Sequence, residues 1–333
     1  MNRILSFDIA KAVALLAVMF GHCAFAGAPT SLVDFCYSFH MPLFFIVSGY
    51  FCSESARVDA DYVRKNARTL LVPYLVTCIV IILGGALLAL LTGSNPLDEA
   101  LKWTIAGLYG AGGVHPGMPA GVIGIGAIWF LWALFWGRLL LAEIDHMPHP
   151  FVISCALFVV GVSTTGIVWL PLGLQNALCA VLFLHVGQYL RKTDLVHRMG
   201  PMLWTCAAAT WLYCGAFCGH LYMEGNSFGN GLLDVIGGIC GTLCLLRIAE
   251  ALERRVPRAA RVVARIGQLS LPLFCMHLVI LNLAPWDRLI AICNSANVSE
   301  WPVALATIMA GSVALTALLR LVLPKRVASC MFR

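Results

Sequence analysis

Three ionisable side chains share the first apolar segment of the chain, RILSFDIAKAVALLAVMFGHC. Asp8 and Lys11 lie three residues apart, and His22 follows eleven residues after Lys11. Since each helical residue turns by about 100°, Lys11 and His22 fall within roughly 20° of one face, about 16 Å apart along the axis. We expect both to face one interior cavity, where His22 can act as a general base. A structural role stays open, because an ion pair alone explains Asp8 and Lys11 and a buried histidine often completes a core.

A pair of arginines precedes the third apolar segment, in DYVRKNARTLLVPYL. Arg64 and Arg68 are one helical turn apart, so both guanidinium groups project from one face. Paired guanidiniums offer fork-shaped donors to phosphate oxygens. This spacing makes them candidates for phosphate binding, although the preference for basic residues in cytoplasmic segments also explains them.

Four further residues within apolar segments are candidates for a substrate pocket: His40, Trp129, Ser270 and His277. His40 stands two residues before Pro42, whose ring and missing N–H free backbone groups to bond a polar side chain or a ligand. For Trp129, a role in helix packing explains its presence in an apolar segment as well as a role in a substrate pocket does. We expect no metal site, since no CxxC pair accompanies histidine at zinc-ligand spacing and most cysteines lie in apolar runs.

The segments that position these residues are too apolar for a protein in water. Hydrophobic residues make up 60% of the 333 positions, charged residues 11%, and the mean hydropathy is +0.87. Soluble domains are about half apolar and a quarter charged. We predict an all-α, polytopic membrane helical bundle that forms a single domain over residues 1–333. The ten expected transmembrane spans are 9–27, 36–52, 70–92, 121–142, 151–169, 171–190, 201–219, 228–248, 268–290 and 301–323.

The basic residues indicate the orientation of these spans. With ten spans and both ends inside, 19 of the 22 Lys and Arg residues fall in cytoplasmic segments. We therefore expect a multi-pass protein of the bacterial inner membrane with both termini in the cytoplasm. The net charge of +6 is spread in small groups rather than in one stripe, so we expect membrane lipid and not nucleic acid as a partner.

Two segments between spans are long enough to have a role of their own. Residues 93–120 face outward, begin with an amphipathic piece around Leu97–Leu108 and continue as a Gly/Pro-rich stretch. They form either a flexible loop or a re-entrant lid over a site. Residues 247–267 carry arginines at near-helical spacing, which favours a surface helix on anionic lipid heads and leaves a nucleotide-phosphate role open.

Taken together, these motifs resemble the membrane-bound acyltransferase family 3, and within it the fucose 4-O-acetylase-like branch. The resemblance covers nearly the whole chain in order and spacing. The residues that carry it are Asp8-Ile-Ala-Lys11 leading to His22, Phe39 to Phe45 with Ser48-Gly49-Tyr50, Arg64 and Arg68 before Pro73-Tyr74, Trp129-Phe130-Leu131, and Gly267 with Ser270-Leu271-Pro272 and His277. Much of the family has arginine at the position of Lys11, and lysine offers a point charge instead of a planar fork.

The resemblance implies an O-acetyltransferase that moves an acyl group, usually acetyl from cytoplasmic acetyl-CoA, to a hydroxyl of a cell-envelope carbohydrate or similar acceptor. Such a transfer needs a general base and positive groups for the developing oxyanion. His22 is the expected base, unless it carries the acyl group itself, and Lys11 and Asp8 complete the expected catalytic set. Arg64 and Arg68 are expected to bind the phosphates of the acyl donor. The alternatives are a proton-coupled transporter or flippase, with Asp8, Lys11 and His22 as a proton relay, and a sensory membrane domain.

Overall fold

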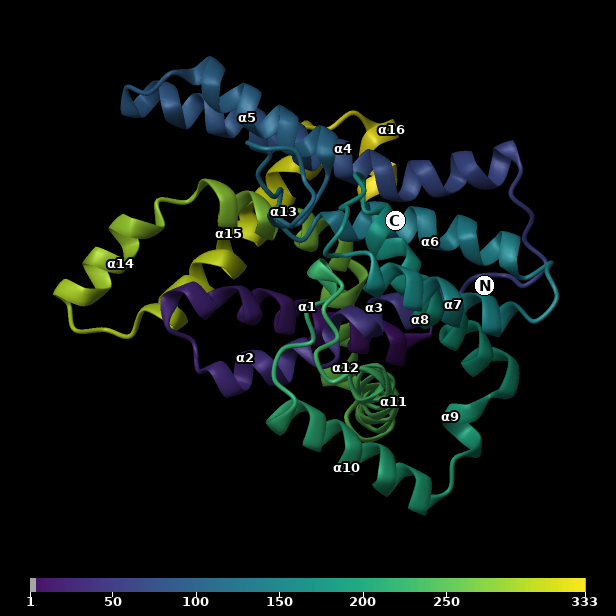
Figure 1. Cartoon of the computed structure of the whole chain (residues 1–333). Coiled ribbons are helices and arrows are strands. Elements are labelled where there is room, and N and C mark those ends of the chain that lie inside the picture. Colours follow the sequence, from purple (N-terminus) through teal and green to yellow (C-terminus); the bar gives the residue numbers. More distant parts are fainter. Residues whose placement is uncertain (1–3, 333) are drawn as a thin grey trace.

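A computed structural model describes residues 4–332 of the chain (Figure 1). These residues form helices joined by loops, and the one β-bridge among them pairs Tyr222 with Ser227. The predicted all-α class is therefore confirmed. The helices are α1 (Leu5–Gly21), η1 (His22–Ala26), α2 (Thr30–Tyr37), α3 (His40–Tyr50), α4 (Ala60–Thr92), α5 (Pro96–Tyr109), α6 (Trp129–Ile144), α7 (Pro150–Ser163), α8 (Leu174–Thr193), α9 (Leu195–Arg198), α10 (Pro201–Phe217), η2 (Met223–Gly225), α11 (Leu232–Arg255), α12 (Pro257–Gln268), α13 (Ser270–Leu283), α14 (Trp286–Ser295), α15 (Glu300–Val322) and α16 (Lys325–Met331).

Five stretches of the described chain are long and apolar enough to cross a membrane. The first is α1 together with η1, and the second is α2 together with α3. The other three are the single helices α4, α11 and α15. Helices α12 and α13 make a sixth if the pair, which bends by 61°, is counted as one span. The other expected spans coincide with α6, α7, α8 and α10. Three of these have only 14 to 17 residues, and α8 carries several polar residues. The helical membrane bundle is confirmed, while the count of ten spans stays a prediction.

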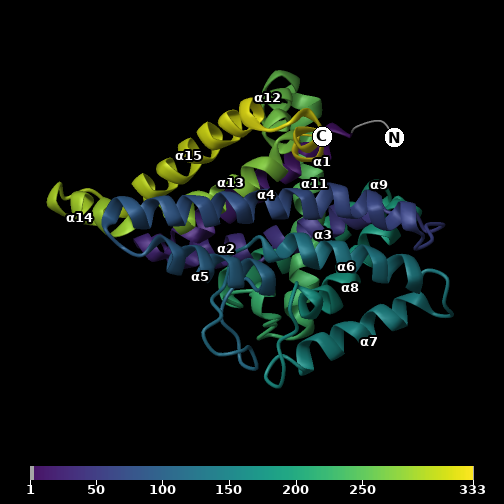
Figure 2. The same cartoon turned by 90° about the horizontal axis from the view of Figure 1, so that it is seen from above.

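The longest helix, α4, shows which solvent surrounds the bundle. It extends across most of the molecule in Figure 2 and begins at Asp59, whose side chain accepts a hydrogen bond from the Tyr62 N–H. Leucines and an isoleucine at every fourth position form a stripe in which each side chain is more than half exposed: Leu75, Ile79, Leu83, Leu87 and Leu91. An exposed apolar stripe of this length is stable only against lipid.

Helix α1 lies inside the bundle, where α2, α3, α11 and α12 pack against it. Several contacts bring backbones together at glycines. A Cβ on Gly267 would lie 1.7 Å from the Asp8 carbonyl oxygen, and one on Gly49 would lie 1.9 Å from that of Leu184. Small residues allow this close packing between membrane helices. Both glycines belong to the motifs singled out in the sequence, and their role is to set the α1–α12 and α3–α8 distances.

The two segments between expected spans differ in structure. After the predicted amphipathic helix, α5, residues 110–128 fold back on themselves, with the Ile125 N–H donating to Ala111 over 2.8 Å and the Gly126 N–H to Gly112 over 3.0 Å. Helix α12 is amphipathic: Ala260, Ala264 and Gly267 are buried, while its arginines are exposed. An amphipathic helix is therefore present at 257–268, whereas residues 247–255 of the predicted segment form the end of α11.

One expected span is shorter than predicted. The sequence pattern extends to residue 290, but α13 ends at Leu283. Ala284 adopts an extended conformation (φ −70°, ψ 145°) because it precedes Pro285, whose ring disfavours the helical conformation of the residue before it. The chain then turns into the separate helix α14.

Candidate active site

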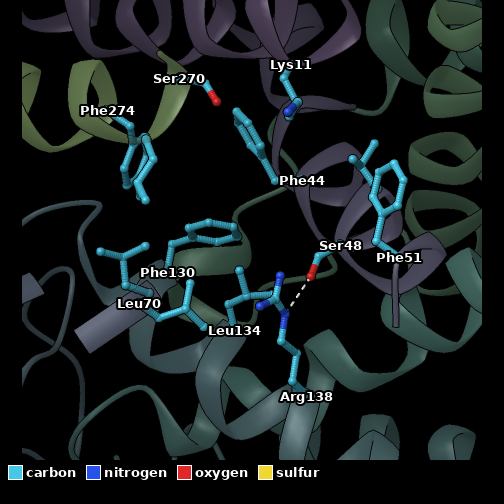
Figure 3. Close-up of a pocket in the computed structure, with 13 residues that line it drawn as sticks. Lys11, Phe44, Ser48, Phe51, Leu70, Phe130, Leu134, Arg138, Ser270 and Phe274 are labelled. Atoms are coloured by element: carbon cyan, nitrogen blue, oxygen red, sulfur yellow. Dashed lines mark hydrogen bonds between the residues drawn. The ribbon is translucent and has the colours of Figure 1, made fainter. Parts of the chain in front are cut away.

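The first of two cavities lies where α1, α3, α4, α6 and α13 meet, and Figure 3 shows its lining. We call it the inner cavity, because its cationic residues lie near segments expected to be cytoplasmic. Its volume is about 240 Å³. It is lined by Lys11, Phe44, Val47, Ser48, Phe51, Leu70, Phe130, Leu131, Leu134, Arg138, Ser270, Leu271 and Phe274. Most of these side chains are apolar, so a few polar groups decide what binds.

Arg138 is the inner-cavity group best suited to an anion. Its Nε donates to the Ser48 hydroxyl over 2.9 Å and its Nη1 donates to the Asn66 amide oxygen over 3.2 Å. No carboxylate within residues 4–332 forms an ion pair with it. A guanidinium has five N–H donors, so donors remain for a ligand. A half-buried arginine without a counter-ion is suited to a phosphate or a developing oxyanion.

Lys11 enters the same cavity but already has a partner. Its Nζ lies 2.7 Å from Asp8 Oδ1, and the side chain of Asp8 is only 4% exposed. The other Asp8 oxygen accepts a hydrogen bond from Gln268 over 3.4 Å. The predicted Asp8–Lys11 pair is therefore present, and Asp8 lies at the α1–α12 contact, outside the linings of both cavities. Figure 3 shows Lys11 and Arg138 pointing into the cavity from opposite walls.

The second cavity, which we call the outer cavity, lies at the other end of α1 and has a volume of about 180 Å³. It is lined by Val18, His22, Tyr37, His40, Met41, Gly112, Gly126, Ala127, Trp129, Leu221, Tyr222, Met223 and Glu224. The loop 110–128 forms part of its wall, as the lid interpretation of that segment predicted. Polar side chains here are histidines, phenols and a carboxylate instead of the cations of the inner cavity.

Local structure explains how His22 and His40 reach the outer cavity. Helix α1 ends at Gly21, where a Cβ would lie 2.6 Å from the Tyr37 ring, and the chain tightens into η1 at His22. His40 is 4% exposed, with its Nδ1 2.7 Å from the Cys36 carbonyl oxygen. If Nδ1 donates there, the Nε2 of a neutral His40 is an acceptor.

Aromatic rings connect the two cavities. Phe44, Phe130 and Phe274 contact one another at the inner cavity, with ring centroids 5.7 to 6.4 Å apart. Phe274 lies 5.1 Å from His277, whose ring lies 5.5 Å from that of His22. The expectation of one cavity shared by Lys11 and His22 is therefore wrong, because bulky side chains divide the space between the two cavities.

His277 is placed to orient His22. The residue is fully buried, and its Nδ1 hydrogen-bonds to the Phe274 carbonyl oxygen. Its Nε2 is buried and has no hydrogen-bond partner among residues 4–332. Because Nδ1 faces a carbonyl it carries the proton, which leaves Nε2 as an acceptor beside the His22 ring.

The structure divides the other predicted site residues between these regions. Trp129 and His40 line the outer cavity, whereas Ser270 lines the inner one and so lies apart from the rest of the predicted substrate pocket. Arg64 and Arg68 are exposed and line neither cavity, and Arg64 forms a 3.6 Å ion pair with Asp61. They lie on the turns of α4 just before Leu70, which does line the inner cavity.

Sequence reasoning missed three polar residues. Arg138 counted only as one basic residue on the cytoplasmic side. His115 and Glu224 belong to outward segments with no helical periodicity, and their side chains meet at 2.5 Å. Only the burial of a charge could have drawn attention to them, and burial is not visible in a loop sequence.

The fold and the two cavities define an integral membrane protein in which one central helix links a cation-lined space to a histidine-lined one. Residues 4–318 match the family described as Acyltransferase domain, and the chain belongs to that acyltransferase family. No curated protein and no solved structure shows significant similarity to the chain. The match covers nearly the whole chain and confirms the resemblance at the level of the family, so the protein is a membrane acyltransferase rather than a transporter or a sensory domain.

Proposed function

We propose that the protein transfers an acetyl group from cytoplasmic acetyl-CoA to a hydroxyl of a cell-envelope carbohydrate, as in the fucose 4-O-acetylase-like branch. The observation that carries this proposal is that cationic side chains lie at one end of α1 and a histidine-lined cavity lies at the other. One end presents Lys11 across the inner cavity from Arg138, which has no counter-ion among residues 4–332, and the other presents His22 in a lining with hydroxyl-bearing and acidic side chains. Anion binding and proton abstraction, the two requirements of acyl transfer from CoA, are thus separated along one helix.

The donor enters at the inner cavity in this proposal. Arg138 and Lys11 contact the pyrophosphate, and Ser270 in the first turn of α13 lies in the same lining, where a helix N-terminus favours anions. Arg64 and Arg68 precede Leu70 by six and two residues, which is about 9 and 3 Å along α4. They are therefore available to the distal nucleotide phosphate at the cavity mouth.

The acetyl thioester then reaches past the Phe274 ring to His22. His22 takes the proton from the acceptor hydroxyl as its oxygen attacks the thioester carbonyl carbon. His277 Nε2, which has no partner among residues 4–332, is the acceptor available to the other ring N–H of His22 when substrate is bound, and such a bond would fix the His22 tautomer. The tetrahedral oxyanion collapses by breaking the C–S bond, and the CoA thiolate leaves with the proton held by His22.

This proposal places the inner cavity toward the cytoplasm and the segments 93–120 and 220–227 outside, in a bacterial inner membrane. Cysteines introduced at Ser94 and at Arg258, both exposed, test the orientation in a background with the accessible native cysteines replaced. We expect an impermeant thiol reagent to label position 94 in intact cells and position 258 only after the inner face is opened. The reverse pattern contradicts the topology.

The activity is tested by comparing envelope glycans by mass spectrometry from cells with and without the protein. We expect O-acetylated glycan only when the protein is present, with label transferred from isotopically marked acetyl-CoA in membranes. Identical glycans, together with no acetyl-CoA-dependent labelling of any envelope fraction, would reject the proposed donor and acceptor.

A further inference from the structure

A buried histidine–carboxylate pair joins the two outer loops above the outer cavity. His115 Nε2 lies 2.5 Å from Glu224 Oε1, and the two side chains are only 10% and 13% exposed. His115 also stacks on Trp169, with ring centroids 3.8 Å apart. The pair therefore holds loop 110–128 against the 220–227 segment, and it places a carboxylate in the cavity lining beside His22.

The glycines of loop 110–128 make room for this carboxylate. A Cβ on Gly112 would lie 2.4 Å from Glu224 Cγ and 2.3 Å from Trp129 Cδ1, and one on Gly113 would lie 3.1 Å from Glu224 Oε1. Any side chain at Gly112 would displace Glu224 or Trp129. The glycines of this stretch therefore do more than allow a turn, because they leave space for the Glu224 side chain.

Only one oxygen of Glu224 is satisfied. Its Oε2 is buried and has no hydrogen-bond partner among residues 4–332. Buried polar atoms almost always have partners, and an unpaired one is costly, so a missing partner points to a ligand that supplies a donor. Burial raises the pKa of the neighbouring Tyr222 phenol, and the approach of the phenol to the Glu224 carboxylate raises it further. The Tyr222 hydroxyl nevertheless does not meet hydrogen-bond geometry to Glu224 Oε2 within residues 4–332.

We infer that Glu224, held by His115, is an acceptor-binding residue that receives a hydrogen bond from a hydroxyl of a neutral, hydroxyl-rich sugar ring in the outer cavity. This inference rests on the proposed function and deepens it. A carboxylate accepts hydrogen bonds from hydroxyls and repels other carboxylates. The cavity, at about 180 Å³, is smaller than the roughly 300–1,000 Å³ of drug-sized ligand sites, so it takes one ring of an acceptor. The carboxylate therefore selects against sugar rings that carry a negative charge.

The test uses purified protein in lipid nanodiscs, acetyl-CoA, and methyl glycosides of glucose and galactose together with the matching methyl uronides. Product is measured by mass spectrometry and CoA release by thiol titration. We expect the parent to acetylate the neutral glycosides and to discriminate against the uronides. Glu224→Gln keeps an oxygen for His115 but turns the free acceptor atom into a donor. Its kcat/KM for the glycosides should fall about ten- to a hundredfold, with the KM for acetyl-CoA unchanged.

Glu99→Gln is the matched control, because it breaks the outer Lys102–Glu99 pair on α5 away from the outer cavity. It should behave like the parent. If Glu224→Gln does not fold, Glu224→Asp keeps the charge but withdraws it by one methylene, and the same fall in glycoside transfer is expected. A folded Glu224 variant with parent rates overturns the inference, as does parent protein that acetylates envelope glycan but binds uronides as well as neutral glycosides. Absence of all acetyl-CoA turnover in the parent instead rejects the proposed function.

Discussion

The inner and outer cavities share α1, α3 and the start of α6 but differ in their polar groups. The inner cavity carries Lys11 and Arg138, and the outer one carries His22, His40 and Glu224. Charge attraction acts over several ångströms, so cationic side chains can bind a charged donor without exact positioning. Proton transfer instead requires a base within hydrogen-bond distance of its substrate. The inner cavity is accordingly lined mainly by apolar side chains with two cationic ends, while the outer one is held by loop–loop contacts and glycines.

The comparison shows that the cationic and the histidine-bearing groups occupy different cavities, so the proposed function separates donor recognition from chemistry. The rings of Phe44, Phe130 and Phe274 lie between the two cavities, so in the proposed mechanism they shift to admit the slender thioester arm and exclude the charged part of the donor. Variants in one cavity should therefore leave the function of the other nearly intact, and the following predictions test that independence.

The largest expected effect is that of His22→Ala, which removes the proposed base from the outer cavity. Acetyl transfer should fall by about 10²–10⁴-fold, the usual contribution of a positioned base, with acetyl-CoA binding close to that of the parent. Calorimetry measures binding and mass spectrometry measures transfer. His146→Ala, at an exposed position outside both cavities, is the control. A folded His22→Ala protein that transfers acetyl at the parent rate ends the assignment.

The next largest effect is expected for Arg138→Ala, in the inner cavity. Loss of a charge-assisted phosphate contact should weaken acetyl-CoA binding about ten- to a hundredfold and leave the acceptor KM unchanged. Arg138→Lys should restore part of the affinity, since it keeps the charge but not the fork. Equal damage to donor and acceptor parameters would show that Arg138 supports the fold through Ser48 and Asn66 rather than the donor.

Gly49→Ala should damage both cavities together. Helix α3 carries His40 at one end and Ser48 at the other, and a Cβ on Gly49 would lie 1.9 Å from the Leu184 carbonyl oxygen. Overpacking of this kind costs about 1–3 kcal/mol, so we expect a lower Tm and activity that scales with folded protein. Gly229→Ala, where a Cβ meets nothing within 4 Å, should leave the Tm unchanged. If the variant loses only donor binding or only acetyl transfer, then α3 does not couple the two cavities.

The smallest effect is expected for Arg64→Ala and Arg68→Ala. Both side chains are exposed, and exposed ion pairs contribute up to about 1 kcal/mol, or about fivefold in affinity. Acetyl-CoA binding at low and high salt measures this, and the loss should shrink as salt rises. If either variant loses as much acetyl-CoA affinity as Arg138→Ala, the main contact with the donor lies at the mouth of the cavity and not inside it.

The sequence alone was enough to predict the helical membrane class, the Asp8–Lys11 pair, an amphipathic helix within 247–267 and the acyltransferase family. These follow from local rules: apolar runs long enough for lipid, side chains that repeat with the helical period, and motifs in a fixed order. Each depends on residues close together in the chain.

Only the tertiary structure decided which side chains share a cavity. Arg138 and Lys11 line one cavity, and Ser270 lines it instead of His40, because α3, α4, α6 and α13 enclose that space together with α1. His115 and Glu224 lie 109 residues apart and meet because two loops without periodicity fold over one cavity. Aromatic side chains close the space between Lys11 and His22. Long-range packing and loop conformation leave no local pattern in the sequence. The sequence therefore identifies candidate residues but does not show which of them form one site.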